Sequence, residues 1–516
     1  MPPKSGPSTR KRNATQQTNV TSAGRKRKAG TISTNAGRER KARKGRTTQY
    51  FVESSFPSDR LIELSLTRNI APTQRLDVYV FGTNCDGELG LGDATKKTEI
   101  QRPVLNPKLS ADTVGVVYLA VGGVHSAALT HDSRILTWGV NDEGALGRDT
   151  RRSPDEIKMR SRSESEESDS EDANGDVNLK EATPSPVESL AFPRDTIFTQ
   201  LAATDSATFA LTADGLVYGW GTFRGNSGKI GFFPEMQSYP EPERQQRTPI
   251  PISGLQNVIK LSAGAQHLLA LTADGTVFSW GCDEQHQLGR RRVHHNASHH
   301  LIPGECALPS GIIDIDVGQY HSFAIHKTGT IYAWGSNNYG QTAIFTSAGQ
   351  SDAVVVYPTK VRSLKGNRKI VSIQGGKDHS LALTEEGQCL SWGRIDNKAI
   401  ELDIRDIPSS NIIYDIYDRP RILKIPTALC GIDKPIISLG IGTDHSFAIT
   451  EDGRAYSWGF NTQYQAGQPG GVDEVVQPTL LSNKHVDGKK LLLAAAGGQF
   501  SMVAGEHTAK ANGAAK

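Results

Sequence analysis

Five histidines recur in one short motif, and imidazole is the side chain in this chain best suited to metal binding or acid–base chemistry. They are His125, His267, His321, His379 and His445, in stretches such as VGGVHSAALT and LGIGTDHSFAIT. One histidine in each of several repeats leaves them too far apart to complete a tetrahedral site, and no cysteine or carboxylate cluster stands beside them. We therefore predict no metal site and assign these histidines to hydrogen bonds within each repeat.

The short motifs of nucleotide-binding and hydrolytic enzymes are missing. The sequence has no G-x-x-x-x-G-K-[ST], no G-x-S-x-G and no H-E-x-x-H. Its five cysteines are scattered without a C-x-x-C pair, as in reduced intracellular proteins: Cys85, Cys282, Cys306, Cys389 and Cys430. We predict no catalytic residue, no cofactor and no covalent chemistry.

The elements that must position any site are repeats. All six tryptophans are followed by glycine, at Trp138, Trp220, Trp280, Trp334, Trp392 and Trp458, and Phe81-Gly82 supplies a weaker seventh copy. Repetition at roughly 50 to 60 residues indicates an array in which no unit buries its apolar face alone. The abundance of glycine, 52 residues, suits many short strands joined by tight turns.

Each copy of the histidine motif, including the copy LAATDSATFALTADG that lacks the histidine, runs through a turn such as Asp214-Gly215, Asp274-Gly275 or Asp452-Gly453 into the next W-G strand. Alternating apolar residues on both sides of Asp-Gly predict a β-hairpin. The strand over residues 77–82 lacks a hairpin partner before it, and the strand over residues 500–505 lacks one after it. We predict an all-β, seven-bladed β-propeller over residues 77–505, whose N- and C-terminal strands close the ring in one blade.

Four segments fall outside this pattern. Residues 1–46 hold fourteen Lys and Arg and one acid, Glu39, which predicts a disordered basic tail. Its function would be an import signal, with Arg25, Lys26, Arg27 and Lys28 as the segment, DNA contact, or both, and a solubilising tail without a partner is the alternative. Residues 47–76 would be a linker and residues 506–516 a C-terminal tail. A Ser- and acid-rich insert over about residues 154–188 predicts a disordered loop that could be phosphorylated. Its acids could screen the basic tail, but a plain spacer is the favoured interpretation. No apolar run is long enough to span a membrane, so no membrane partner is expected.

Residues 77–505 resemble the regulator of chromosome condensation family, propellers whose founding member is the guanine nucleotide exchange factor for the small G protein Ran. The resemblance rests on the seven repeats and on VNDEGALGRDT at residues 140–150, WGTFRGNSGKIGFF at 220–233 and CDEQHQLGR at 282–290. It implies a nuclear, chromatin-associated protein that promotes GDP release and GTP loading on Ran. Its implied partners are a Ran-type G protein, nucleosomal histones and DNA, and an import receptor that reads the basic tail.

The resemblance also implies site residues. In the family, a wedge after the third-blade W-G presses against the G protein, and here it corresponds to Phe223, Arg224, Gly225, Asn226, Ser227, Gly228, Lys229 and Ile230. The two glycines and the turn formers between them suit a tight projecting hairpin. An ordinary variable loop is the alternative.

Further positions follow from the same resemblance. The rim facing the G protein would include Asp205, Gln266 and Asp378, although Gln266 replaces a usual acid and Asp378 a usual polar residue or histidine. A basic loop for chromatin would be formed by Arg290, Arg291 and Arg292, with a solvated loop as the alternative. The departures at Gln266 and Asp378 leave open another function, a chromatin-binding propeller scaffold without exchange activity.

Overall fold

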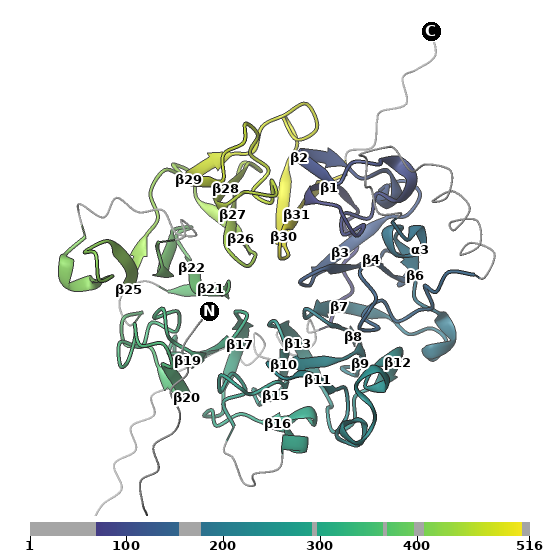
Figure 1. Cartoon of the computed structure of the whole chain (residues 1–516), viewed down its shortest axis with the longest axis horizontal. Helices are drawn as coiled ribbons and strands as arrows, with labels where there is room; N and C mark the ends of the chain where they lie inside the picture. Colours follow the sequence, from purple (N-terminus) through teal and green to yellow (C-terminus); the bar gives the residue numbers. More distant parts are fainter. Residues whose placement is uncertain (1–68, 154–176, 291–296, 365–368, 397–406, 508–516) are drawn as a thin grey trace, which may run out of the picture. The chain divides into compact units, whose positions relative to one another are not determined.

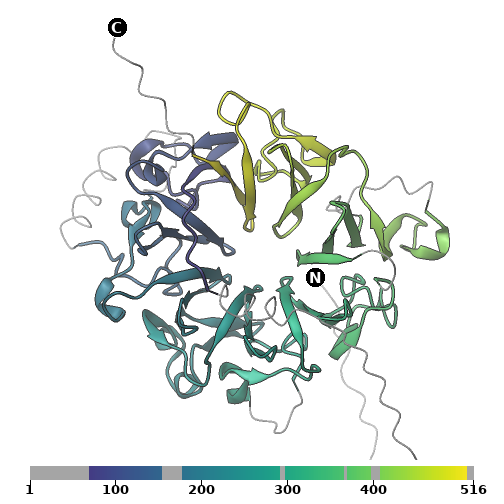
Figure 2. The ribbon, with the colours of Figure 1, turned by 180° about the vertical axis from the view of Figure 1, so that it is seen from behind.

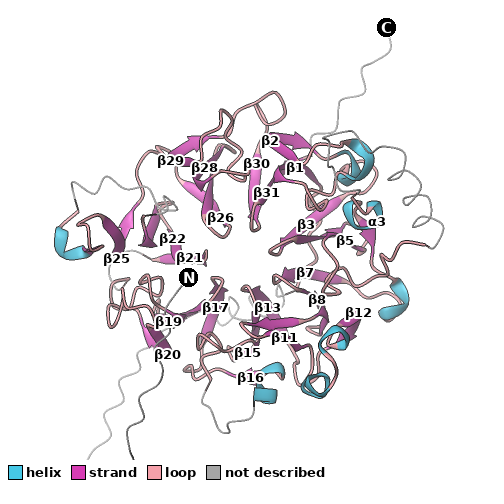
Figure 3. Ribbon diagram, in the orientation of Figure 1, coloured by secondary structure: helices cyan, strands magenta, loops and turns pink. Residues whose placement is uncertain are grey.

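The structure is a computed structural model, and it describes residues 69–153, 177–290, 297–364, 369–396 and 407–507. Seven antiparallel sheets stand around a central channel, each with its first strand at the channel and its last at the rim (Figure 1). The few short helices lie in connections at the rim (Figure 3). The predicted seven-bladed β-propeller is confirmed.

The blades are numbered from the one that joins both ends of the ring, and their strands run from channel to rim. Blade 1 contains β30 (Leu491–Ala496), β31 (Phe500–Glu506), β1 (Leu76–Thr83) and β2 (Glu99–Leu105). Blade 2 contains β3 (Val116–Val121), β4 (His125–Thr130), β5 (Ile135–Gly139) and β6 (Ser185–Pro186). Blade 3 contains β7 (Phe198–Ala203), β8 (Ala207–Thr212), β9 (Val217–Gly221) and β12 (Gln246–Pro251).

The other four blades repeat this order. Blade 4 contains β13 (Val258–Ala263), β14 (His267–Thr272), β15 (Val277–Gly281) and β16 (Gly304–Glu305), and blade 5 contains β17 (Ile312–Val317), β18 (His321–His326), β19 (Ile331–Ser336) and β20 (Val354–Lys360). Blade 6 contains β21 (Ile370–Gly375), β22 (His379–Thr384), β23 (Cys389–Arg394), β25 (Pro420–Ala428) and a fifth strand, β24 (Ile412–Tyr414). Blade 7 contains β26 (Ile436–Ile441), β27 (His445–Thr450), β28 (Ala455–Phe460) and β29 (Glu474–Leu480).

The helices among the described residues have three to five residues: α3 (Leu179–Ala182) and the 3-10 helices η1 (Gly92–Ala94), η2 (Pro107–Leu109), η3 (Ser189–Ala191), η4 (Pro234–Ser238), η5 (Glu241–Glu243), η6 (Ala297–Leu301) and η8 (Ser409–Asn411). No helix in the described part of the chain has the length and apolar character needed to cross a membrane.

The glycine after each tryptophan has a positive φ and lies against the carbonyl oxygen of the residue before the second strand of its blade. In blade 4, Leu268 pairs with Trp280 and His267 with Gly281, so the W-G pair ends the third strand beside the start of the second. Gly281 has φ +112°, and a Cβ there would lie 2.5 Å from the carbonyl oxygen of Gln266. A larger residue would therefore meet both backbone strain and a clash.

Blade 1 closes the ring as predicted. β31 lies between β30 and β1, and the register pairs Asp77 with Gly505 and Gly82 with Phe500. Closure extends slightly further than expected, because the two ring nitrogens of His507 donate hydrogen bonds of 2.9 Å to the carboxylates of Asp77 and Asp112. The first two residues of the predicted C-terminal tail, Glu506 and His507, thus belong to the ring.

The repeated histidines link neighbouring blades, so their assignment to bonds within each blade is wrong. Each Nε2 lies 2.7–2.9 Å from a hydroxyl on the second strand of the next blade, in the pairs His125–Thr208, His267–Ser322, His321–Ser380, His379–Ser446 and His445–Ser501. The hydroxyls of Ser322 and Ser380 donate to the carbonyls of Gln287 and Gln341. Because each hydroxyl proton is used there, the imidazole Nε2 must be the donor to the hydroxyl.

Two junctions lack this bond. Between blades 3 and 4, Ala207 stands in the histidine position and Leu268 in the hydroxyl position, and both are buried. Between blades 1 and 2, Phe500 stands opposite Ser126, whose buried hydroxyl has no hydrogen-bond partner among the described residues. The sequence pattern alone showed the substitutions without revealing that they alter a blade junction.

The acidic insert ends earlier than the sequence predicted. Residues 154–176 lie outside the described residues, but α3 and β6 occupy much of the stretch from 177 to 188. Ala182 of α3 is buried, and Ser185 pairs with Thr137 as part of the rim strand of blade 2. This stretch is ordered because it supplies the fourth strand that the blade requires.

The predicted linker also has an ordered end. Residues 69–75 precede β1, and Asn69 donates a 2.9 Å hydrogen bond from its side chain to the carbonyl of Val258 in blade 4. Val258 begins the channel strand of that blade, on the face where the tight turns between second and third strands lie. We call this the turn face; Figure 2 shows the ring from behind the view of Figure 1.

Candidate functional site

A two-stranded hairpin rises from blade 3 on the face opposite the turn face. It consists of β10 (Phe223–Gly225) and β11 (Gly228–Gly231), with Arg224 opposite Lys229 and Gly225 opposite Gly228. Gly228 has φ +111°, which other residues rarely adopt. The predicted wedge (residues 223–230) is thus a hairpin, and we call the face that carries it the wedge face.

Aromatic stacking fixes the base of the wedge. Phe223 and Phe232 are buried and stack on each other and on Phe209 of β8, with ring centroids 5.9–6.1 Å apart. Gly219 of β9 leaves the necessary room, since a Cβ there would lie 2.6 Å from the Phe209 ring. The wedge therefore starts from the core of blade 3, while Arg224, Asn226 and Ser227 are exposed.

Three glutamates, from blade 2, blade 4 and the connection after β11, contact the outer part of the hairpin, residues 224–229, which we call the tip. Glu143 of blade 2 pairs with the Arg224 guanidinium and lies 3.2 Å from the Lys229 ammonium. Glu284 of blade 4 accepts the Asn226 backbone N–H at 3.0 Å on each oxygen. Glu241 of η5 accepts the Lys229 backbone N–H at 3.0 Å.

Beside the wedge lies a hollow of about 660 Å³. Five carboxylates line it, against the two cations Arg224 and Lys377: Asp142, Glu143, Asp205, Glu284 and Asp378. The hollow brings together part of the wedge and all three predicted rim positions. Its excess of acids suits a basic partner surface.

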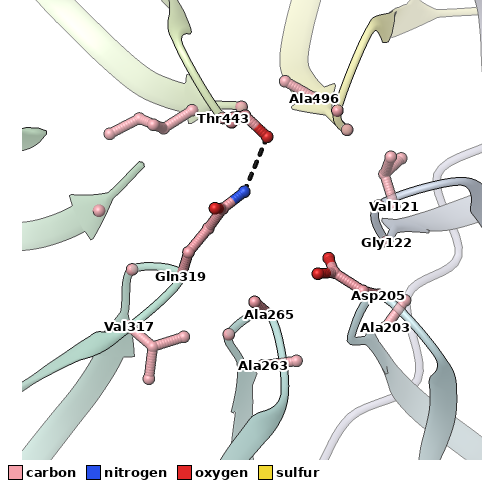
Figure 4. Close-up of a pocket in the computed structure, with 18 residues that line it drawn as sticks. Val121, Gly122, Ala203, Asp205, Ala263, Ala265, Val317, Gln319, Thr443 and Ala496 are labelled. Carbon is pink, nitrogen blue, oxygen red and sulfur yellow. Dashed lines mark hydrogen bonds between the residues drawn. The ribbon is translucent and has the colours of Figure 1, made fainter. Parts of the chain in front are cut away.

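Asp205 lies where the hollow meets the mouth of the central channel. Its carboxylate points into the space between the channel strands, across from Gln319, which donates a 2.7 Å hydrogen bond to Thr443 (Figure 4). Burial raises the pKa of Asp205 to about 6, against an opposing effect of its hydrogen bond with Gln266. A partner's cation at this position would favour the ionised carboxylate.

Gln266 supports the wedge from below. Its side-chain oxygen accepts the Arg224 backbone N–H at 2.7 Å, and its nitrogen donates to the Ser206 hydroxyl at 3.2 Å. An amide can do both at once, whereas an ionised acid could only accept. Gln266 is buried, and its two hydrogen bonds connect blade 4 to blade 3.

Asp378 lies on the far side of the hollow and is paired within the protein. Its carboxylate is 3.3 Å from the Arg394 guanidinium, which also pairs with Asp396 and lies 4.8 Å from the centroid of the Tyr339 ring. Burial raises the pKa of Asp378 although Arg394 and Lys377 oppose the shift. The acid is therefore held in a fixed place by Arg394.

Arg290 does not lie in the hollow. Its guanidinium donates to the carbonyls of His299, His300 and Ile302 at 3.0–3.4 Å and so closes the connection from β15 to β16. Arg148 of blade 2, in the matching L-G-R triplet, donates in the same way to the carbonyls of Thr137, Lys180 and Thr183. Arg291 and Arg292, like the import signal Arg25, Lys26, Arg27 and Lys28, lie outside the described residues.

The sequence reasoning did not single out Glu143 and Glu284. A signal was available, because both stand in the two W-G loops that flank blade 3, in NDEG and CDEQ. No cluster of three or more histidine, cysteine or acidic side chains that could hold a metal ion occurs within the described ranges.

The propeller is of a known class. The RCC1-like domain model matches residues 77–503, and the chain belongs to that family. The match covers the ring from β1 to β31.

Two fungal proteins are similar to this chain along most of its length. Protein pim1 of Schizosaccharomyces pombe is 40% identical over 438 residues, which cover 84% of this chain and 75% of pim1. Guanine nucleotide exchange factor SRM1 of Saccharomyces cerevisiae is 36% identical over 84% of this chain and 88% of its own length. The chain thus resembles fungal members of the family over the whole ring.

A solved structure has the same fold. The crystal structure of Prp20p from Saccharomyces cerevisiae, described with its binding properties toward Gsp1p and histones, has a TM-score of 0.76 and 32% identity. The match covers 87% of this chain and 95% of Prp20p. A second structure, of Kap60 bound to yeast RCC1 (Prp20), matches with a TM-score of 0.75 and 31% identity over 92% of this chain and 97% of that one.

Proposed function

We propose that this protein is a guanine nucleotide exchange factor for a Ran-type small G protein and that it acts in the nucleus on chromatin. The observation that carries the proposal is a structurally supported hairpin standing beside an acidic hollow on the wedge face. The exchange factor SRM1 and Prp20p, studied with Gsp1p and histones, support it as relatives of this chain.

An exchange factor makes and breaks no covalent bond. It binds the nucleotide-free G protein more tightly than the loaded one, so nucleotide is bound less tightly in the complex by the same factor. Release about ten thousand times faster requires a barrier lowered by roughly 5.5 kcal/mol, since each tenfold corresponds to about 1.4 kcal/mol. Several contacts must act together to supply that difference.

The wedge and the residues around the hollow would have different roles in nucleotide release. The wedge would displace the nucleotide-binding elements of the G protein, because its tip is exposed and its base is buried. Asp205 and Asp378 would hold basic side chains of the G protein at the rim of the hollow. Gln266 would act through the wedge, since its amide is bonded to the Arg224 backbone.

Chromatin contact would use the remaining predicted parts. Arg291 and Arg292 suit carboxylates of histones or phosphates of DNA, because a guanidinium binds either with paired hydrogen bonds. The basic tail of residues 1–46 would add DNA contacts and recruit an import receptor. The Kap60 complex of yeast RCC1 supports the import role by relationship.

The deciding experiment measures release of a fluorescent GDP analogue from purified Ran with catalytic amounts of this protein. The full chain should accelerate release strongly, and replacing residues 224–229 by a two-residue link should reduce that acceleration at least about a hundredfold, roughly 2.7 kcal/mol. The thermal midpoint should change little, because a surface loop adds little to a propeller core.

A chain lacking residues 1–46 serves as the matched control. It should keep full exchange in solution and lose affinity for DNA. A folded full-length protein that leaves GDP release unchanged would instead favour the scaffold without exchange activity.

A further inference from the structure

The wedge is too small to order itself. β10 and β11 have three and four residues, and an isolated hairpin of two short strands is marginal in water. The Phe223–Phe232 stack fixes only its base. The conformation of the tip must therefore be set by groups outside the hairpin.

Two of those groups are carboxylates of the neighbouring blades, and a third, Glu241 of η5, lies in blade 3 and accepts the Lys229 N–H. Glu284 accepts the Asn226 N–H with both oxygens, at the turn of the hairpin. Glu143 pairs with Arg224 and Lys229, which stand opposite each other on the two strands, so one carboxylate joins both strands. Only 15% of the Glu143 side chain is exposed, which limits screening of this pair by solvent.

We propose that Glu143 and Glu284 are positioning residues that hold the wedge in its working conformation before the G protein binds. The inference rests on the proposed exchange function. Blades 2 and 4 stand on either side of blade 3, so the two glutamates hold the tip from both sides. Ordering the tip in advance removes an entropic cost that the complex would otherwise meet at the barrier.

The same contacts would also fit an inhibitory role for Glu143. If Glu143 occupied Arg224 in competition with the G protein, removing its charge would speed exchange. The Asn226–Glu284 contact argues for ordering, because a backbone N–H held by a carboxylate fixes the chain without occupying a side chain that could reach the partner.

The test uses the full-length variants Glu143→Gln and Glu284→Gln, with Glu386→Gln as the control. Glu386 is exposed in the turn between β22 and β23, on the turn face. Amide hydrogen exchange of Asn226 and Lys229 in the unbound protein reports ordering directly, and GDP release from Ran reports function.

We expect each glutamate variant to exchange these amides about tenfold faster and to lower kcat for GDP release about tenfold, with KM changed less than kcat. Glu386→Gln should match the wild type in both. Unchanged amide exchange, or looser amides with wild-type kcat, would overturn the inference, and so would faster GDP release by Glu143→Gln. If the wild type itself releases no GDP, the exchange function fails, while the amide measurement still decides whether the glutamates order the hairpin.

Discussion

At the scale of single residues, the interblade histidines make the ring sensitive to acid. Burial lowers the pKa of His125 and His379 to about 4 and of His267, His321 and His445 to about 3. An unfolded histidine titrates near 6.5, so the unfolded chain binds protons first as the pH falls. The stabilising effect is present above about pH 6.5 and is lost progressively toward pH 3 to 4.

We therefore expect the free energy of unfolding to fall by about 1.4 kcal/mol per histidine for each pH unit below 6.5. Denaturant unfolding at pH 7.5, 6.0 and 5.0 measures this, and His445→Gln should show a shallower slope than the wild type. Groups whose pKa is raised titrate in the opposite direction and reduce the net slope: Asp205 and Asp316, whose pKa burial raises to about 6, and Glu88, Glu181, Asp378 and His507. Equal slopes for the wild type and His445→Gln would contradict the assignment.

Asp205 should make partner binding depend on pH. It attracts a basic partner only when ionised, so affinity for nucleotide-free Ran should be full above about pH 6 and decline as the pH falls through that value. Asp205→Asn should bind about tenfold more weakly at pH 7.5 and show a flatter profile between pH 7.5 and 6.0. Calorimetric titration at both pH values checks this.

The same substitution has an opposite effect on stability. A carboxyl whose folded pKa is raised binds its proton more tightly in the folded state, so it opposes folding once ionised, above about pH 6. Asp205→Asn should not lower the thermal midpoint at pH 7.5. A pH profile of binding identical to that of the wild type would remove Asp205 from the proposed contact.

At the scale of elements, Arg290 has a structural role that is separate from the chromatin contact proposed for Arg291 and Arg292. Arg290 closes the β15–β16 connection through three carbonyls, so Arg290→Ala should destabilise the protein by about 1.5–3 kcal/mol. The double variant Arg291→Glu/Arg292→Glu should keep the wild-type midpoint and exchange activity and lose affinity for nucleosomes. Thermal unfolding and nucleosome gel shifts distinguish the two, and equal loss of stability in both variants would show that Arg291 and Arg292 are structural as well.

The elements also show what the sequence could predict. The hairpins follow from Asp-Gly turns and W-G strands, because those signals are local. The histidine bonds could not be assigned to blade junctions, because their partners, such as Thr208 for His125, are 55 to 83 residues away in sequence. The family resemblance located the wedge, but only the folded structure shows Gln266 and Glu143 supporting it from other blades.

At the scale of the whole molecule, the ring depends on one strand. β31 pairs with both β30 and β1, so removing residues 499–516 would leave the two sides of blade 1 unjoined and uncover Val78 and Phe81. We expect this truncated chain to aggregate or to unfold without cooperativity. Removal of residues 508–516 alone should leave the thermal midpoint at the wild-type value.

Size-exclusion chromatography and thermal unfolding followed by circular dichroism compare the two truncations. Cooperative unfolding of the chain without residues 499–516 within a few degrees of the wild type would show that the ring is stable without β31.

The position of β31 in the sequence also determines how long β1 stays unpaired while the chain is synthesised on the ribosome. About 400 residues separate the end of β1 at Thr83 from the start of β31 at Phe500, and translation at 5–20 residues per second takes roughly 20–80 s to cover them. During that interval β1 has no partner on one edge, although its LDVYVFGT sequence is mostly apolar. The nascent chain is therefore most exposed to misassembly and to chaperone binding at its first strand, long after that strand has left the ribosome.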